Sequence, residues 1–439
     1  MRILLSSFAI SPTRGSEAGV GWQVASRLAQ EHDVTVLYGD LDGRGELKRE
    51  LEEWIQGHPD ASRMTFVYVP PGRLSIMCEK LHLKPGLFPL YHLGYQLWQK
   101  RALAIARDLH RAAPFDLVHQ ITYAAYWEPG YLWKLGIPYF WGPVAGGNVV
   151  PLQYIPILGM RGALEAIARS VLSKLRFFTH PRIRAAARRA SHIWCVTAKE
   201  RAILSRFSRQ TSIMLETGTV RGDMYIRRLG QGETLQVIWS GMHTPNKALP
   251  ILVRAAAQLS PKGNVVIHVL GAGRGSSQET ERAKVLAGRL GVSSRIVWHG
   301  NLPRGQALQR MREGHVLVFT SLLEASSTVV MEALSQGMPV VCHDTCGMAT
   351  AITSDCGIKI AMTGVKDSIR GFRDAIQALI DNPAQLEQLS KGAALRSQAL
   401  GWEQKIVEFC RAYAAEDRSL LQKQSCASPS ASSLPRQIA

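Results

Sequence analysis

Long apolar runs and a cysteine framework are both missing from this sequence. The chain has no uninterrupted apolar stretch of about 18 residues, so we expect no membrane-spanning helix. The apolar start at residues 3–10 is too short for a signal sequence and predicts a first β-strand. The 7 cysteines are scattered, and only Cys342 and Cys346 are close enough to suggest a metal-binding pair. A disulfide framework is therefore disfavoured, and the thiols are typical of a reduced, cytoplasmic protein.

Acidic residues are scarce compared with basic ones. The sequence has 34 Asp and Glu against 52 Lys and Arg, which gives a net charge of +18. Residues 1–230 carry +12 of this charge and residues 231–439 carry +6. Such an excess favours a partner that bears phosphate groups: a nucleic acid, an anionic lipid or a phosphorylated ligand. The hydrophobic content of 46% is ordinary for a globular protein and excludes a wholly disordered chain.

Short apolar runs alternate with longer helical stretches through both halves of the chain. Most runs are continuously apolar, as expected for strands that are buried on both faces. This alternation predicts mostly parallel sheets with helices on both sides. The predicted strands are residues 2–8, 33–38, 65–69, 116–121, 138–141, 192–197 and 213–216, then 235–240, 265–270, 295–299, 316–321 and 339–343, with a less clear one around residue 357.

A stretch rich in glycine and polar residues, 217–233, interrupts the alternation and is predicted to be a linker. The fold class is therefore α/β, with two doubly wound, Rossmann-like domains at residues 1–216 and 234–400 that face each other across a cleft. Ligands bind at the carboxyl ends of the strands in such sheets, so the cleft is the expected active site. We expect a helix at 401–417 that returns to the first domain, and a disordered tail at 418–439.

The strongest chemical pattern lies in residues 316–343, where a buried strand is followed by a loop and a helix. Glu324 lies in the loop, and Glu332 lies on the second turn of the predicted helix. A helix N-terminus presents unpaired N–H groups to a phosphate, and carboxylates suit the hydroxyls of a sugar. The alternative is a capped turn and a solvated helix face, and the pattern alone does not decide between them. The expected helix-capping residues are Ser326, Ser327 and Thr328.

The spacing E-x₇-E, followed by A-L-S-Q-G-M-P-V-V, resembles the retaining glycosyltransferases of family four (glycosyl transferases group 1), which have the GT-B fold. Members of that family read E-G-x-x-x-x-x-x-E-A-x-A-x-G-x-P-V-V, and here Ala325 replaces the first glycine. The resemblance covers residues 1 to about 410. It implies transfer of a sugar from a nucleotide-diphosphate sugar with retention of the anomeric configuration. It also implies that Glu324 contacts the donor sugar and that Glu332 contacts the ribose.

A second segment, I-W-S-G-M-H-T-P-N-K-A-L, resembles the family pattern G-R-L-x-x-x-K-G. Gly241 and Lys247 match the pattern, whereas Met242 replaces its arginine and Ala248 replaces its last glycine. The resemblance implies that Lys247 stabilises the leaving diphosphate. The missing guanidinium weakens this site unless another side chain replaces it.

Two residues, His243 and Arg304, are candidates for that replacement. A turn after the strand at 265–270 contains Gly271 and Gly273, which match the family's glycine-rich turn near the nucleotide base. Ser276 stands where a dinucleotide-binding fingerprint would need a third glycine, which disfavours a nicotinamide-dependent oxidoreductase.

The acceptor side of the cleft is predicted in the first half of the chain. The loop of Gly15, Ser16 and Glu17 joins the first strand to the first helix, and the equivalent family loop borders the donor phosphate and the acceptor. Glycine there lets a ligand approach the backbone closely. His119 follows a family context, D-x-x-H, and is expected to face the cleft as a catalytic residue, although a lone strand histidine is also typical of a core. Glu128 is a further acceptor-side candidate.

A basic segment at residues 161–189 carries eight Arg and Lys against one Glu, with apolar residues between them. It predicts an amphipathic helix that binds an anionic membrane surface, although a solvated helix packed on the sheet is the alternative. The aromatic and basic residues 74–101 are a second candidate. A W-G-P-x-x-G-G stretch at 141–147 resembles a signature of bacterial polysaccharide glycosyltransferases. A lipid-linked acceptor would fit these features.

These patterns together predict a cytoplasmic, peripheral glycosyltransferase that acts on a nucleotide sugar and a glycan or lipid-linked acceptor in surface polysaccharide synthesis. No cofactor or metal is expected, because a lysine and the charge of a helix end can neutralise the diphosphate. The only Asp-x-Asp pair, Asp40 and Asp42, lies in a polar loop away from the donor motif. Two alternatives remain open: a nucleotide-sugar epimerase of the same architecture, and a basic, non-enzymatic protein that binds phosphate or nucleic acid. No nucleic-acid-binding module is visible, so no nucleic-acid partner is expected.

Overall fold

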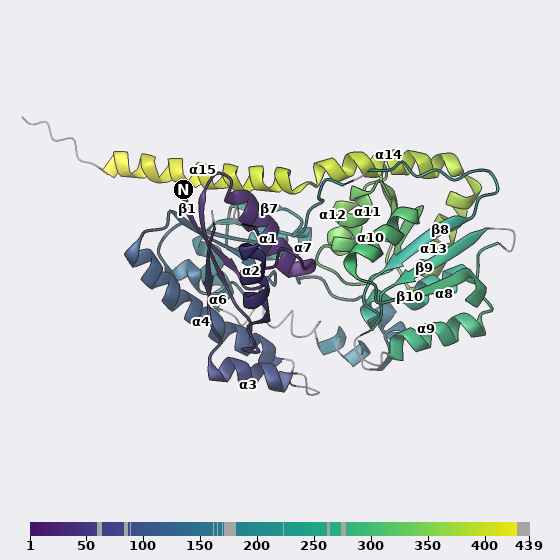
Figure 1. Ribbon diagram of the computed structural model, residues 1–439, viewed down its shortest axis with the longest axis horizontal. Helices are drawn as coiled ribbons and strands as arrows, with labels where there is room; N and C mark the ends of the chain where they lie inside the picture. Colours follow the sequence, from purple (N-terminus) through teal and green to yellow (C-terminus); the bar gives the residue numbers. More distant parts are fainter. Residues whose placement is uncertain are drawn as a thin grey trace, which may run out of the picture.

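The chain folds into two α/β domains that lie side by side, and its last two helices, α14 (Pro383–Ala399) and α15 (Trp402–Ala427), follow one another along the second and the first domain (Figure 1). This computed structural model describes residues 1–58, 64–82, 87, 89–160, 162–164, 166–168, 170, 181–222, 224–260, 264–273 and 278–427, with side chains to residue 418. Within these residues, no helix is long and apolar enough to cross a membrane.

The first domain is built on a seven-stranded parallel sheet with the order β3-β2-β1-β4-β5-β6-β7. The order reverses at β1, so β1 and β4 lie at the topological switch point where doubly wound sheets bind ligands. The predicted strands are all present, although the last is shorter and ends at Ile213 rather than at residue 216. The strands are β1 (Arg2–Ser7), β2 (Asp33–Tyr38), β3 (Met64–Tyr68), β4 (Leu117–Thr122), β5 (Tyr139–Val144), β6 (Ala190–Cys195) and β7 (Thr211–Ile213).

Helices cover both faces of this sheet because each has one apolar side. In α4, for example, Tyr95, Trp98, Ala102 and Ala106 recur at helical spacing and are buried against the sheet. A capping box of Thr197 and Glu200 begins α7. The helices of this domain are α1 (Ser16–Leu28), α2 (Glu46–Gln56), α3 (Arg73–His82), α4 (Pro89–Ala112), α6 (Pro181–Arg189) and α7 (Ala198–Leu204), with a 3₁₀ turn η2 (Leu132–Lys134).

The second domain has a six-stranded parallel sheet with the order β10-β9-β8-β11-β12-β13. Its edge strand β13 (Gly357–Ile360) is the one that the sequence left unclear. The other strands lie where they were predicted, to within two residues at either end. They are β8 (Leu235–Ser240), β9 (Val265–Leu270), β10 (Ile296–Gly300), β11 (Val316–Phe319) and β12 (Val340–His343). Two doubly wound domains of this kind confirm the predicted fold class.

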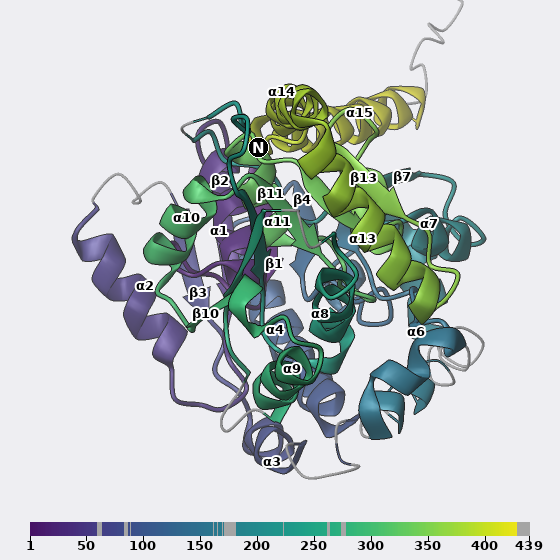
Figure 2. The same cartoon turned by 90° about the vertical axis from the view of Figure 1, so that its right-hand side faces the viewer.

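The helices of the second domain divide between the two faces of its sheet (Figure 2). One face packs against α8 (Leu249–Ala256), α9 (Gln278–Arg289) and α13 (Val365–Asp381), and the other packs against α10 (Arg304–Glu313), α11 (Thr328–Ser335) and α12 (Cys346–Ala351). Two 3₁₀ turns are η4 (Pro245–Lys247) and η5 (Ser293–Arg295).

One segment of the first half packs on the second domain. Val150, Tyr154 and Leu158, around the 3₁₀ turn η3 (Leu152–Ile157), are buried in the core that α8 and α13 share. The hydroxyl of Tyr154 lies 2.6 Å from the Ser368 hydroxyl on α13. The boundary predicted at residue 216 therefore marks where the chain crosses over, but the first 216 residues do not all pack within one domain.

The chain also crosses between the domains at Gly401, which pairs with Thr219 of the linker. After α14 (Pro383–Ala399), the final helix α15 (Trp402–Ala427) leaves the second domain and packs against α1 of the first. Figure 1 shows α15 lying along the first domain. The helix runs ten residues beyond the predicted end at 417, because this stretch is rich in strong helix formers such as Leu, Gln and Lys. Residues 428–439 of the predicted tail lie outside the described residues.

Candidate active site

The E-x₇-E segment forms the predicted strand, loop and helix. Ser327 is the N-cap residue of α11, and Glu324 precedes it in the loop after β11. The Glu324 carboxylate forms an ion pair with Lys247, and both side chains are largely buried. The hydroxyl of Ser321 donates a second hydrogen bond to Glu324 over 2.7 Å. The two residues that the sequence proposed for catalysis on the donor side are therefore in direct contact.

The second glutamate of the pattern, Glu332, is paired with Arg304 at the start of α10. Both Nε and Nη2 of Arg304 donate to the same carboxylate oxygen, Oε1, at 3.1 and 2.7 Å. Burial raises the pKa of Glu332, and the guanidinium of Arg304 opposes this shift. The N-cap residue of α1, Gly15, lies close by, since a Cβ built on it would be 3.9 Å from Nε of Arg304. The first domain therefore approaches the donor helix at this point.

A residue that the sequence did not single out, Glu216, connects the two domains. Its backbone N–H donates to the Ser326 hydroxyl over 3.0 Å, and the Ser326 backbone N–H donates to the Glu216 carboxylate over 3.4 Å. The N–H of Thr217 also lies 3.4 Å from the same hydroxyl. Glu216 had been assigned to the last strand of the first domain. Its position, at the end of that domain and just before the linker, was the one sequence signal for this role.

Carboxylates from both domains gather in the cleft. Burial, together with the nearby charges of Glu17 and Glu324, raises the pKa of Glu216 to about 8, although Ser326 and Lys405 act to lower it. Burial also raises the pKa of Glu17 to about 7, although the N–H of Ala124 donates to its carboxylate over 3.1 Å. Two carboxyl groups in the cleft can therefore gain or lose a proton near neutral pH, which is typical of functional sites.

The glycine-rich turns pack directly on one another at the edge of the second sheet. Gly271, after β9, has a φ of 112°, and a Cβ on it would come within 2.1 Å of the Gly241 carbonyl oxygen. Only glycine fits this close approach. Gly241 in turn borders the side chain of Lys247, and Gly273 follows in the half-buried turn. The predicted donor glycines are thus grouped beside Lys247.

Met242 and His243 follow Gly241 and differ in exposure. The Met242 side chain is 41% exposed and uncharged. His243 is buried, with its Nδ1 2.7 Å from the Thr280 hydroxyl and its ring edge-on to Trp239. Burial lowers the pKa of His243 to about 4, so it is neutral at physiological pH. The expectation that His243 could replace the missing guanidinium is therefore wrong.

Residues 227–396 match the family model described as "Glycosyl transferases group 1". This part of the chain is a glycosyl transferases group 1 domain. Curated relatives include the D-inositol 3-phosphate glycosyltransferases of Kribbella flavida (30% identical over 42% of this chain and 44% of that protein) and Streptomyces griseus (27% identical over 39% and 37%). The chain therefore spans about two fifths of the length of the curated relatives it matches.

Solved structures resemble the whole chain rather than the group 1 domain alone. Sucrose-phosphate synthase from Thermosynechococcus elongatus gives a TM-score of 0.63 at 16% identity and covers 95% of this chain and 99% of its own. The Anabaena protein HepE in complex with UDP gives 0.61 at 15% identity, with 94% and 100% covered. At this identity the likeness establishes the fold, which is GT-B.

His119 does not face the cleft beside the group 1 domain. It is fully buried on the side of the first sheet that α15 covers, where Nδ1 lies 2.6 Å from the Tyr413 hydroxyl and Nε2 lies 2.8 Å from the Gly142 carbonyl oxygen. Phe409 and Trp194 pack on its ring, and burial lowers its pKa to about 3. The prediction that it faces the transferred sugar is wrong, because the alternation along β4 points this side chain toward α15.

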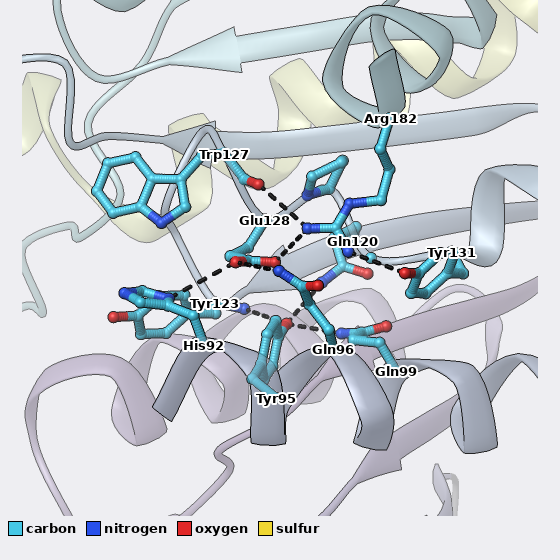
Figure 3. Close-up of polar contacts among 12 residues, drawn as sticks. His92, Tyr95, Gln96, Gln99, Gln120, Tyr123, Trp127, Glu128, Tyr131 and Arg182 are labelled. Carbon is cyan, nitrogen blue, oxygen red and sulfur yellow. Dashed lines mark hydrogen bonds and ion pairs between the residues drawn. The ribbon is translucent and has the colours of Figure 1, made fainter. Parts of the chain in front are cut away.

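Glu128 is also engaged inside the protein and is not open to an acceptor (Figure 3). Its carboxylate is buried, and Arg182 of α6 donates to it over 2.6 Å while Gln96 of α4 donates over 3.0 Å. His92 lies 3.6 Å away. The predicted acceptor contact is corrected: Glu128 holds α4 and α6 together. Its ion pair with Arg182 could not be predicted from the sequence, since the two residues are 54 positions apart.

The basic segment is described only in part. Residues 161, 165, 169 and 171–180 lie outside the described residues. On α6, Ile183 and Ala187 are buried, and Arg182 and Arg189 lie over the rings of Tyr131 and Trp133, at 5.1 and 5.0 Å from the ring centroids. The helix α6 is therefore basic and packs on the first domain through its apolar side, whereas Gly162 and Ala166, earlier in the segment, lie against the second domain.

No group of three or more His, Cys, Asp or Glu that could hold a metal ion occurs in the described parts of the chain. Asp40 accepts hydrogen bonds from the N–H groups of Gly43 and Gly45, at 2.9 and 3.1 Å, and from the Tyr68 hydroxyl at 2.9 Å. The Asp40 side chain therefore organises a turn. Cys342 and Cys346, the one close cysteine pair of the sequence, are both buried free thiols.

The raised pKa of Glu216 predicts a pH-dependent effect of Glu216→Gln. The folded protein holds a proton that the unfolded chain, with an ordinary pKa of 4.5, releases above that pH. The stability contributed by Glu216 therefore falls as pH rises from about 5 to about 8. Glutamine does not titrate, so the melting temperature of the variant, relative to wild type, should rise across this range.

Thermal unfolding of both proteins at pH 5, 6.5 and 8 measures this difference, and other titrating groups cancel in the comparison. The surface variant Glu281→Gln on α9 controls for the loss of one negative charge. A difference in melting temperature that stays constant from pH 5 to pH 8 would show that Glu216 carries no proton at neutral pH.

Proposed function

We propose that this protein is a glycosyltransferase that moves a sugar from a nucleoside-diphosphate sugar to a glycan or lipid-linked acceptor, with retention of the anomeric configuration, in the synthesis of surface polysaccharide. The observation that carries this proposal is the pair of cation–carboxylate contacts, Lys247 with Glu324 and Arg304 with Glu332, beside the N-terminus of α11. These contacts lie inside the group 1 domain.

The donor would bind along α11. The backbone N–H groups at the start of the helix, from Ser326 to Thr328, would contact the diphosphate, because a helix N-terminus favours negative charge. Glu332 would accept hydrogen bonds from the ribose hydroxyls, and Glu324 would orient the transferred sugar. Lys247, already beside Glu324, would contact the diphosphate as well.

The chemical step needs charge stabilisation where the glycosidic bond breaks. Negative charge develops on the leaving diphosphate, and fixed cations and N–H groups aimed at that position lower the barrier most effectively. Lys247 and the start of α11 supply such groups. The Gly15 loop would border the diphosphate on the side of the first domain. The leaving phosphate can take the proton of the acceptor hydroxyl. In this proposal the reaction needs no resident metal or other cofactor.

The acceptor would bind in the first domain, which borders the cleft through Ser16 and Glu17 of α1. Curated relatives are named for an inositol phosphate acceptor, but they match this chain over only about two fifths of their length. A lipid-linked acceptor fits the basic first half and the arginines of α6. We therefore place the protein in the cytoplasm, in peripheral contact with an anionic membrane.

Donor binding predicts stabilisation by one nucleotide class. UDP, GDP, ADP and CMP, and their sugar conjugates, are added in turn while the melting temperature is followed. A ligand at 100 times its Kd stabilises the native state by about 2.7 kcal/mol, enough to raise the melting temperature measurably. We expect one diphosphate to give such a rise, and Glu332→Ala to abolish it.

The matched control is Glu313→Ala, an exposed glutamate at the end of α10. It should keep the response of the wild type. A wild-type protein that responds to none of these nucleotides would overturn the proposed function. Formation of a sugar epimer without added acceptor would instead favour the epimerase.

Retention predicts the configuration of the product. Proton NMR of the purified product should show the new glycosidic bond with the same anomeric configuration as the donor sugar. An inverted anomeric centre in that spectrum would refute the retaining mechanism while leaving glycosyl transfer intact.

Membrane contact predicts binding to anionic vesicles. Near an anionic surface each basic residue contributes about 1 kcal/mol. In flotation, the protein should rise with vesicles that contain phosphatidylglycerol and stay below with neutral phosphatidylcholine vesicles. Replacing Arg184 and Arg188 of α6 with Gln should reduce binding, whereas the same change at Arg310 and Arg312 of the second domain should not. Equal flotation with both lipids would argue against charge-driven contact.

A further inference from the structure

Arg304 holds a position between the two walls of the cleft. It is the first residue of α10, directly after the turn that follows β10. Its side chain is 57% exposed, yet it touches Glu332 of the donor helix and lies against the Gly15 loop of the first domain. A guanidinium placed in this way can contact any ligand that fills the space between α11 and that loop.

The pairing of Arg304 with Glu332 uses only part of each group. Nε and Nη2 both donate to Oε1 of Glu332. Within the residues that the structure describes, neither Nη1 of Arg304 nor Oε2 of Glu332 has a hydrogen-bond partner. The planar guanidinium group of an arginine carries five N–H donors and can donate to two oxygens of one phosphate at the same time. Arg304 therefore keeps donors for an anion while Glu332 keeps an oxygen for a hydroxyl.

Other positive charges near the cleft are already engaged. Lys247 is paired with Glu324, and Arg14 is paired with Glu50 over 2.6 Å. Lys405 is buried and donates to the Leu215 carbonyl oxygen over 2.5 Å. Arg14 is also exposed and uses only its Nε, but among these described cations Arg304 is the one that contacts Glu332 of α11 and lies beside Gly15.

We propose that Arg304 binds the diphosphate of the donor, and that it does so by reaching across the cleft between the Gly15 loop and Glu332. This inference rests on the proposed function, because it names the residue that recognises the diphosphate of that substrate. Arg304 lies outside both the E-x₇-E pattern and the G-R-L-x-x-x-K-G pattern, and the proposal gives it the diphosphate contact for which the sequence had offered it as a candidate. A diphosphate in this position would draw the guanidinium away from Oε1 and leave Glu332 to the ribose.

Titration of UDP, GDP and ADP, with UMP, GMP and AMP as comparators, tests this role by calorimetry. Loss of charge-assisted hydrogen bonds in Arg304→Gln should weaken binding of the diphosphate that the wild type prefers by about tenfold or more, and binding of the matching monophosphate much less. Arg304→Lys keeps a point charge without the fork and should fall between the two. The matched control is Arg310→Gln, on the same helix and paired with Glu313.

A rescue variant separates recognition from a structural effect. Met242 is exposed and follows Gly241, at the position of the arginine in the pattern G-R-L-x-x-x-K-G. Met242→Arg in the Arg304→Gln background should restore preference for the diphosphate, since it returns one guanidinium to the cleft. The melting temperatures of the ligand-free variants verify that each is folded.

The outcomes separate the two proposals. A wild type that binds a diphosphate, together with an Arg304→Gln variant that binds it equally well, overturns the role of Arg304 and leaves the proposed function standing. Equal weakening of mono- and diphosphate by that variant also overturns the role, because it shows no contact specific to the diphosphate. A wild type that binds no nucleotide overturns the proposed function itself.

Discussion

The cleft depends on the reciprocal hydrogen bonds between Glu216 and Ser326. Glu216 lies at the end of the first domain, and Ser326 directly precedes Ser327, the N-cap residue of α11 in the second domain. These bonds therefore hold the two domains together at this point. Lys405 of α15 supports the same junction through the carbonyl oxygen of Leu215. Since parallel strands carry their loops at one edge of the sheet, fixing this junction brings the loops of both sheets together. Every contact described across the cleft follows from that placement.

Charge in the cleft is balanced before any ligand arrives. Lys247 and Arg304 are each matched by a glutamate, and the charge of Glu17 contributes to the raised pKa of Glu216. Burying a charge without a partner costs several kcal/mol, so the largely buried Lys247 needs its pairing with Glu324 in the folded state. Lys247 and Arg304 are therefore already positioned by carboxylates of the chain itself.

The sequence predicted the strands well because buried parallel strands are continuous apolar runs, and the helices between them followed from the same alternation. It also located α11, the helix between the loop of Glu324 and the strand β12, from its capping residues and the glycine that follows it. It failed for His119 and Glu128, because the direction of a side chain and its distant partners depend on packing. Glu216 was missed for the same reason: its partner, Ser326, is 110 positions away in the chain.

The end of α15 was also placed too early, because small and polar residues after 417 suggested a tail, whereas helix-forming residues continue to Ala427. The packing of Tyr154 on the second domain shows a related limit. Local patterns indicate where an element begins and what type it is. They do not indicate which of two similar domains it packs on.

The linker and the start of α15 lie against each other. The N–H of Thr219 donates to the Leu400 carbonyl oxygen over 3.1 Å, and the Trp402 N–H donates back to Thr219 over 3.3 Å. The segment around Tyr154, which is buried in the core of the second domain, connects the two domains at another place. Any relative motion of the domains is therefore tethered at two separate places along the chain.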